Sequence, residues 1–317
     1  MIRQETSLPH TGIATFCKAA YVPDLSQLDA DVGVIGVPTD FAASMRPGCR
    51  QGPRAIRDAS TRFGWLGAPA GSAGFFDVNT RKFRMPHLRI ADCGDVDIVF
   101  SDDERNQKRI EAMVRQVLDR GTMPLILGGD HSISYPAIRA FEQFAPLTIL
   151  LIDAHLDYRD RFLGLPFTNN SPFRRARELT FVQQILSFGI RGIKSTDREF
   201  QESLRHGNRI FTNYEIFDQG VDGILASLPP SLGHYYLSID IDGLDPSLAP
   251  GTETPEAEGL TFRQVKQLLQ GIGSRGNLVG LDLVEVNPYL DHSEMTSHIA
   301  VQLLLEALST ANRTGPA

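Results

Sequence analysis

Acidic residues and histidines gather in three short motifs, each directly after an apolar run. The motifs are Gly128-Gly-Asp-His131, Asp153-Ala-His-Leu-Asp157 and Asp240-Ile-Asp242. Imidazole nitrogens and carboxylate oxygens are common ligands of divalent metal ions. A single Asp-x-Asp is explained more simply as a helix cap or a strand end. Three such motifs in one chain favour a common metal site, and the side chains predicted to form it are His131, Asp153, His155, Asp157, Asp240 and Asp242.

Spacing within the motifs supports a shared site. Residues i, i+2 and i+4 of an extended chain point to the same side, so the three ionisable residues of the second motif can converge, and so can Asp240 and Asp242. Four buried carboxylates facing one point would repel one another strongly without a cation. Two divalent ions would balance these charges, and hydroxide held between ions about 3.5–4 Å apart would be a nucleophile. The motifs therefore predict a hydrolase that uses a pair of metal ions.

The elements that must position these residues alternate between strands and helices. Runs that are apolar almost throughout are typical of parallel strands covered on both faces. Such strands are predicted at 31–37, 123–127, 147–152, 186–190, 235–239 and 278–284. Ligands of an open parallel sheet bind at the carboxyl ends of its strands, where the three motifs lie. Glu285 follows the last apolar run in the same way.

Helices are predicted between these strands from capping residues and apolar periodicity. Ser101 with Glu104 has the pattern of a capping box, and so does Thr261 with Gln264. The predicted helices lie at 55–60, 101–120, 265–272 and 299–308. No repeat or low-complexity linker interrupts the alternation, so residues 1–317 are predicted to form one α/β domain.

Composition and charge limit the classes of partner. The formal net charge of −7 argues against nucleic acid, which needs clustered Lys and Arg, and fits a small cationic substrate better. Cys17, Cys49 and Cys93 lack any CxxC spacing, which indicates buried, reduced thiols. The sequence begins with no signal-peptide pattern and contains no apolar run long enough to span a bilayer. These features predict a soluble, cytoplasmic protein with no membrane partner.

The motifs resemble those of the ureohydrolase superfamily, which comprises arginases and agmatinases. The third motif extends to Ser238-Ile-Asp-Ile-Asp-Gly-Leu-Asp-Pro246, and further similar segments lie at 46–57, 249–256 and 284–288. They are more similar to the agmatinase branch than to arginase. The resemblance implies a three-layer α/β/α fold with a parallel central sheet and the hydrolysis of a guanidino or amidino group, usually with release of urea. It also implies a homo-oligomer, a trimer or hexamer, and residues 1–30 are predicted to be an N-terminal extension at a subunit interface.

The resemblance also implies a role for each site residue. Asp153 and Asp240 would bridge two divalent ions, and each ion would be completed by one further pair: His131 with Asp157, and His155 with Asp242. Mn²⁺ is the usual metal of the family, although Ni²⁺ would bind such ligands at least as tightly. Glu285 would accept the substrate guanidinium, because a planar fork of donors matches a carboxylate.

One position departs from the agmatinase pattern. Agmatinase-like chains carry His-Gly-(Thr/Asn/Ser)-Pro before Phe-Arg-Arg, whereas this chain has Asn169 in the place of that His. In the family this His shuttles protons or contacts the substrate. An amide cannot deliver a proton near neutral pH, and simple loss of a general acid lowers a rate by about 10²–10⁴-fold. Three explanations are open: a changed substrate with the proton handled by Asp157 or a metal-bound water, replacement by His292, or a subunit with little activity.

A second departure lies in the loop after the third motif. Glu253 stands where the family has Gly in Gly-Thr-Gly-Thr-Pro-Glu. A carboxylate there either selects cationic or polyamino substrates or is a solvated surface change. The predicted substrate-binding residues are Asn169, Asn170, Ser171, Glu253 and Glu285, and those predicted to take part in catalysis are Asp157, Asn169 and Glu285.

Several functions remain open from the sequence. The first is a hydrolase of agmatine, 4-guanidinobutyrate, 3-guanidinopropionate or guanidine. A second is a nickel-dependent hydrolase of an N-alkylated guanidine or a biguanide such as metformin, assembled as a hetero-oligomer with a related chain. A third is a weakly active partner subunit kept for assembly. A single-zinc deacetylase of related architecture is disfavoured because it lacks the paired Asp-x-His-x-Asp and Asp-x-Asp motifs.

Overall fold

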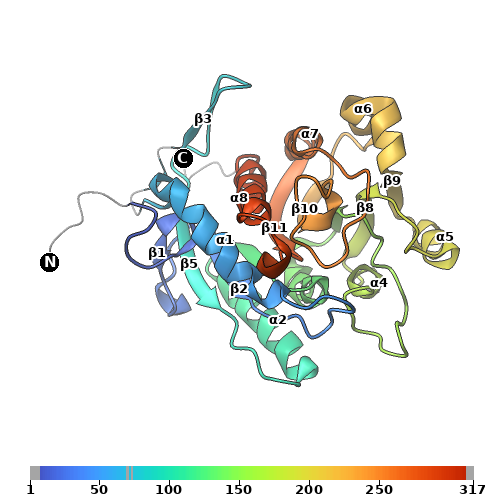
Figure 1. The fold of residues 1–317 in the computed structure, drawn as a ribbon, viewed down its shortest axis with the longest axis horizontal. Coiled ribbons are helices and arrows are strands. Elements are labelled where there is room, and N and C mark those ends of the chain that lie inside the picture. Colours follow the sequence, from blue (N-terminus) through green and yellow to red (C-terminus); the bar gives the residue numbers. More distant parts are fainter. Residues whose placement is uncertain (1–7, 69–70, 73, 312–317) are drawn as a thin grey trace, which may run out of the picture.

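A nine-stranded parallel sheet forms the centre of the molecule (Figure 1). The computed structural model describes residues 8–68, 71–72 and 74–311. The strands of the sheet are β1 (Ala20–Tyr21), β2 (Val32–Val37), β5 (Ile90–Asp95), β6 (Met123–Gly128), β7 (Leu147–Ile152), β8 (Val182–Ile190), β9 (Arg209–Thr212), β10 (Gly233–Asp240) and β11 (Gly276–Val284). Their order across the sheet is β1-β5-β2-β6-β11-β10-β7-β8-β9, and every neighbouring pair is parallel. A separate antiparallel hairpin is formed by β3 (Phe75–Asp77) and β4 (Lys82–Arg84).

Helices cover both faces of this sheet, which gives the three-layer α/β/α arrangement expected from the sequence (Figure 1). One face packs against α1 (Gly52–Ser60), α6 (Asn213–Ser227), α7 (Phe262–Gly273) and α8 (Met295–Leu308). The other packs against α2 (Asp103–Asp119), α3 (Ser134–Ile138) and α4 (Pro172–Ala176), while α5 (Asp197–Arg205) lies beside β9. Within β6, Leu125 and Leu127 enter the first core and Ile126 enters the second. Both faces are therefore apolar, which explains the unbroken apolar runs.

All six predicted strands are present, and the structure adds three to the central sheet that the sequence did not predict, besides the β3–β4 hairpin. These are β1, β5 and β9. The sequence of β5 is Ile90-Ala-Asp-Cys-Gly-Asp95, which reads as a polar loop. Asp92 is nevertheless buried, because Nε of Arg57 donates to its carboxylate at 2.8 Å. The ion pair between Arg57 and Asp92 thus allows a buried carboxylate in a strand that lacks the apolar pattern.

The predicted helices are present, but one predicted capping box is wrong. Helix α2 is capped by Asp102, whose side chain accepts from the backbone N–H of Arg105, while Ser101 has a φ of 59°. The left-handed backbone at Ser101 removes it from the cap position. The capping box at Thr261 and Gln264 is confirmed as the start of α7.

Part of the predicted N-terminal extension is built into the fold. Phe16 and Cys17 are fully buried, and the backbone N–H of Phe16 donates to the carboxylate of Asp92 at 2.8 Å. Strand β1 then pairs with β5 at the edge of the sheet. Residues 1–7, the start of the predicted extension, lie outside the described residues.

The cysteines are free and buried, as predicted. They are Cys17, Cys49 and Cys93. Burial raises the pKa of Cys93 to about 12, so its thiol is protonated near neutral pH. Among the described helices, none combines the length and the apolar character needed to cross a bilayer.

Candidate metal centre

The three motifs meet because the strands that precede them are neighbours. Strands β6, β11, β10 and β7 are consecutive in the sheet and run in the same direction. Their carboxyl ends therefore lie along one edge. His131 follows β6, Asp153 follows β7, Asp240 ends β10 and Glu285 follows β11. The six predicted ligands and Glu285 all come from this edge, as expected for a parallel sheet.

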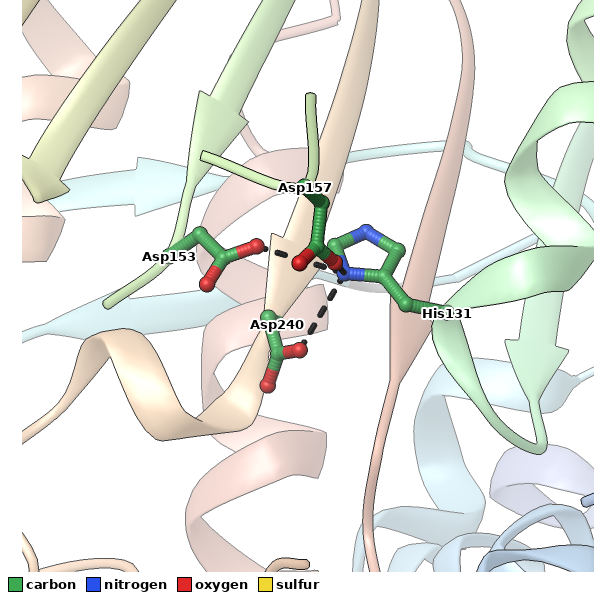
Figure 2. Close-up of side chains that lie close together, drawn as sticks. All are labelled: His131, Asp153, Asp157 and Asp240. Atoms are coloured by element: carbon green, nitrogen blue, oxygen red, sulfur yellow. Dashed lines mark ion pairs between the residues drawn. The ribbon is translucent and has the colours of Figure 1, made fainter. Parts of the chain in front are cut away.

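One group of possible ligands surrounds His131. Figure 2 shows three carboxylates that point toward one nitrogen of its ring. Nδ1 of His131 lies 3.1 Å from Oδ2 of Asp157, 3.1 Å from Oδ2 of Asp240 and 3.3 Å from Oδ2 of Asp153. The ligand atoms of these four residues all lie within 4.8 Å of one another, which is close enough to hold a single ion.

A second group shares Asp153 with the first. It consists of Asp153, His155 and Asp242. Nδ1 of His155 lies 3.1 Å from Oδ2 of Asp242 and 3.6 Å from Oδ1 of Asp153. Asp153 therefore presents one carboxylate oxygen to each histidine. Asp240 lies in the first group, and its Oδ1 accepts from the backbone N–H of Asp242 at 2.9 Å.

The local backbone differs from the extended chain assumed from the spacing. Asp157 has a φ of 45°, in the left-handed region, so the alternation of an extended chain does not continue through it. The turn is supported by a local hydrogen bond, from the backbone N–H of His155 to Asp153 at 2.6 Å, and by a longer-range one, from the backbone N–H of Phe173 to the carbonyl of Asp157 at 3.2 Å. The prediction of convergence is correct, but a turn produces it.

These residues fit a pair of divalent cations. Nδ1 of His131 and Oδ2 of Asp153 are buried and have no hydrogen-bond partner among the residues that the structure describes, a costly arrangement unless an ion lies between them. Burial alone would lower the pKa of His131, yet the carboxylates of Asp153, Asp157 and Asp240 raise it well above 6.5. In the same way the pKa of His155 is raised by Asp242 and Asp153 against the effect of burial. The cluster thus attracts positive charge, and its imidazole and carboxylate donors suit Mn²⁺ or Ni²⁺.

A buried chain of hydrogen bonds, through Ser238 to Asp282, orients the ring of His131. Nε2 of His131 lies 3.0 Å from Oγ of Ser238, which donates to Asp282 at 2.6 Å. The hydroxyl of Tyr236 donates to the other oxygen of Asp282 at 2.6 Å. A hydrogen bond at one ring nitrogen directs the other toward the cluster. Sequence reasoning missed Asp282, although an Asp inside the otherwise apolar strand β11 was a usable signal.

Glu285 lies against the first group of ligands. Its Oε1 accepts from the backbone N–H of His131 at 2.8 Å, and the thiol of Cys49 donates to Oε2 at 3.1 Å. Burial and then the charges of Asp240, Asp130 and Glu253 raise the pKa of Glu285 well above 4.5. A carboxylate held in this way is well suited to receive a cation. The contact from Cys49 was not predicted.

The loop that carries Asn169 is hydrogen-bonded to the segment that directly follows the second motif. The backbone N–H of Arg159 donates to the carbonyl of Asn170 at 2.9 Å. Nδ2 of Asn170 donates to Oδ1 of Asn169 at 2.6 Å, and Nδ2 of Asn169 donates to Oε2 of Glu253 at 3.5 Å. Ser171 is buried, but its hydroxyl bonds Thr168 at 2.8 Å instead of another predicted substrate residue.

Glu253 is not a solvated surface residue. Its exposed fraction is 1%, so the surface alternative for this departure is wrong. Its Oε1 accepts from the backbone N–H of Met45 at 2.5 Å and from the hydroxyl of Ser44 at 3.2 Å. The next residue, Thr254, donates to Oδ2 of Asp242 at 3.3 Å. The loop of Glu253 therefore rests directly on the second group of ligands.

Two further residues, Glu256 and Arg191, contact the ligand groups, whereas no contact with these groups is found for His292 among the described residues. His292, the candidate replacement for the missing His, is exposed, and its backbone N–H donates to Asp291 at 2.8 Å. Oε1 of Glu256 lies 3.5 Å from Nε2 of His155, a contact that was not predicted. The guanidinium of Arg191 was also missed. It donates to the backbone carbonyls of Gly189, Asp242, Gly243, Leu244, Glu256 and Ala257.

Comparison with known proteins agrees with this architecture and site. The model of the Arginase family matches residues 30–309. The chain is 35% identical to guanidinobutyrase of Pseudomonas aeruginosa over 303 residues, and this match covers 94% of this chain and 92% of that protein. It is 35% identical over 284 residues to agmatinase of Bacillus subtilis, covering 88% and 91%. The solved structure of proclavaminate amidino hydrolase from Streptomyces clavuligerus has a TM-score of 0.80 at 32% identity, over 96% of this chain and 98% of that one. The chain therefore belongs to the arginase family, in its agmatinase-like branch of hydrolases that cleave C–N bonds of amidines and guanidines.

Proposed function

We propose that the protein hydrolyses a guanidino C–N bond of a small guanidine compound and releases urea. The observation that carries the proposal is the position of Asp153, whose two oxygens face two separate groups of ligands. Two adjacent ions are the arrangement that activates water for hydrolysis in binuclear centres. Agmatine, 4-guanidinobutyrate, 3-guanidinopropionate and guanidine are the candidate substrates.

The proposed ligand assignment follows the two groups. Asp153, which is common to both groups, would hold both ions; His131 and Asp157 would complete one, and His155 and Asp242 the other. Asp240, which stands in the first group, would act as the second shared ligand. When bound, the ions supply a hydroxide at neutral pH and polarise the guanidinium. Mn²⁺ is proposed as the metal, with Ni²⁺ as the alternative.

Glu285 is proposed to hold the guanidinium. The backbone N–H of His131 and the thiol of Cys49 fix its carboxylate, so little reorganisation is needed when substrate binds. Two parallel N–H donors of a guanidinium would pair with its two oxygens. Asp157 would take the proton that the attacking water loses and return it to the departing nitrogen, because Asn169 has no acidic proton to deliver. Asn169, Asn170 and Ser171 are proposed to line the substrate side.

The test is urea release by the purified chain loaded with Mn²⁺ or Ni²⁺, across guanidines with different tails. Metal analysis on the same preparation should give two ions per chain. Asp153→Asn should abolish turnover, while Asp29→Asn, a change to an exposed carboxylate, should leave it intact. A metal content near one per chain with no turnover would instead favour the single-zinc deacetylase.

A second candidate rests on Asn169, which replaces the expected imidazole. It is a nickel-dependent hydrolase of an N-alkylated guanidine or a biguanide such as metformin, active as a hetero-oligomer with a related chain. Turnover that appears only when the related chain is added would favour it, and would also identify this chain as a partner subunit with little activity alone. Three properties remain predictions: assembly as a homotrimer or homohexamer, the interface role of residues 1–30, and the cytoplasmic location. Light scattering on the purified chain tests the predicted assembly.

A further inference from the structure

The two positions that depart from the agmatinase pattern contact each other. Asn169 and Glu253 are 84 residues apart, and Nδ2 of the amide donates to Oε2 of the carboxylate at 3.5 Å. The amide oxygen of Asn169 is held by Nδ2 of Asn170 at 2.6 Å, which leaves the amide nitrogen directed toward Glu253. A histidine at 169 and a glycine at 253 could not make this contact. The two departures therefore form one local structure.

One oxygen of the Glu253 carboxylate has unused hydrogen-bond acceptor capacity. Its Oε1 is occupied by the backbone N–H of Met45 and the hydroxyl of Ser44. Its Oε2 receives only the long hydrogen bond from Asn169 among the described residues. A carboxylate offers about four acceptor positions, so Oε2 retains capacity. Arg46, the nearby cation, donates to the backbone carbonyl of Glu253, and within the described part of the chain the carboxylate of Glu253 forms no ion pair.

A buried carboxylate that lacks a cation is costly, and a charged ligand offsets that cost. Glu253 is 1% exposed, as deeply buried as Glu285, which is 4% exposed. Both carboxylates lie near the Cys49 thiol. Burial is the largest cause of the raised pKa of that thiol, and the charges of Glu285 and Glu253 raise it further. Thr254 also ties the loop of Glu253 to Asp242. The site thus contains a second negative group beside the proposed guanidinium partner.

We infer that Glu253, positioned by Asn169, binds the non-reacting end of the substrate. It selects guanidines that carry a cation or N–H donors at that end, such as an ammonium or a second amidino group, and it disfavours guanidino acids. This inference rests on the proposed function of the same site. The relatives do not decide the point, since a guanidinobutyrase, whose name indicates a substrate with an anionic tail, and an agmatinase match equally at 35% identity.

Agmatine and 4-guanidinobutyrate provide the test, because they share a guanidinium and differ mainly in an ammonium or carboxylate tail. The full chain, loaded with Mn²⁺ or Ni²⁺, is assayed for kcat/KM and for the thermal shift that each compound produces. The wild type should prefer agmatine by at least about tenfold, and Glu253→Gln should remove most of that preference. Glu253→Asp keeps the charge and should retain part of it. Glu258→Gln is the matched control: it alters an exposed carboxylate of the same loop that pairs with Tyr214.

Each outcome decides the inference separately from the proposed function. A preference for agmatine that falls in Glu253→Gln, with metal content unchanged, supports it. Equal treatment of the two tails, a preference that Glu253→Gln leaves intact, or no thermal shift with either compound overturns it. If no guanidine releases urea but agmatine still stabilises the protein through Glu253, the proposed function fails and the binding role remains. Loss of metal in both Glu253 variants would show that the residue is structural and would also overturn the inference.

Discussion

Asp153 and His131 face each other across the first group of ligands, with Oδ2 of the carboxylate 3.3 Å from Nδ1 of the ring. Neither atom has a hydrogen-bond partner among the described residues, although both are buried. Because the other oxygen of Asp153 lies 3.6 Å from His155, the same side chain also belongs to the second group. The position of Asp153 between two histidines makes the two proposed ion sites interdependent.

This interdependence predicts unequal losses of metal. Asp153→Asn should lower the occupancy of both sites, because each ion loses a shared ligand. Asp242→Asn should chiefly affect one, since Asp242 belongs to the second group alone. Elemental analysis of the purified variants measures the difference. Retention of one full equivalent by Asp153→Asn would contradict the bridging assignment.

The chain of hydrogen bonds behind His131 should control metal affinity. Ser238→Ala removes the hydrogen bond that orients the imidazole, and Asp282→Asn weakens the support of Ser238. We expect Mn²⁺ affinity to fall by roughly 10–100-fold in either variant. Calorimetric titration of the metal-free protein gives this value without an activity assay. Tyr236→Phe, which removes only the outer hydrogen bond to Asp282, should have the smaller effect.

Arg191 should be required for stability more than for chemistry. Its buried guanidinium donates to six backbone carbonyls, and burial lowers the pKa of this group. Arg191→Met would leave these carbonyls without their donor, at a cost on the order of 3–5 kcal/mol in the free energy of unfolding. Urea denaturation measures the loss. Arg198→Met, at an exposed ion pair with Glu202, should change stability far less.

The pair of Asp77 and Lys266 should make stability depend on pH in the acid range. Burial alone would raise the pKa of Asp77, but hydrogen bonds from Lys266, Thr80 and the backbone of Asn79 hold it at about 2, below its ordinary 3.8. A depressed pKa contributes stability that is present above pH 3.8 and is lost as the pH falls toward 2. The stability difference between the wild type and Asp77→Asn should therefore shrink over that interval. Denaturation of both metal-free proteins checks this, and a constant difference would refute it.

Asn169→His tests whether the two departures act together. The larger ring would lose the contacts that Asn169 makes with Asn170 and Glu253, so we expect native turnover to fall. Glu253→Gly in the same chain should relieve part of that loss, because it restores the family pairing. A double-mutant cycle on kcat/KM measures the coupling. Purely additive effects would show that the two departures are independent.

Local sequence patterns were sufficient for the cluster of possible metal ligands and for six of the nine strands of the sheet. Unbroken apolar runs identify the central strands, and parallel strands of one sheet end at one edge. The residues directly after those runs must therefore meet. For this reason His131, Asp153, Asp240 and Glu285 could be predicted together without any contact information. Thr261, which caps α7 through neighbours in sequence, was predictable on the same local ground.

Contacts between segments far apart in the chain were decided only by the tertiary structure. Ser238 and Asp282 are 44 residues apart, and Asn169 and Glu253 are 84 apart, yet each pair forms a hydrogen bond. No periodicity encodes such contacts, because they depend on strand register and on how loops fold over the sheet. The sequence by itself determined which chemical groups stand at the strand ends. The packing of the loops decided that Glu253 is buried against Asn169, because only folding removes that carboxylate from water.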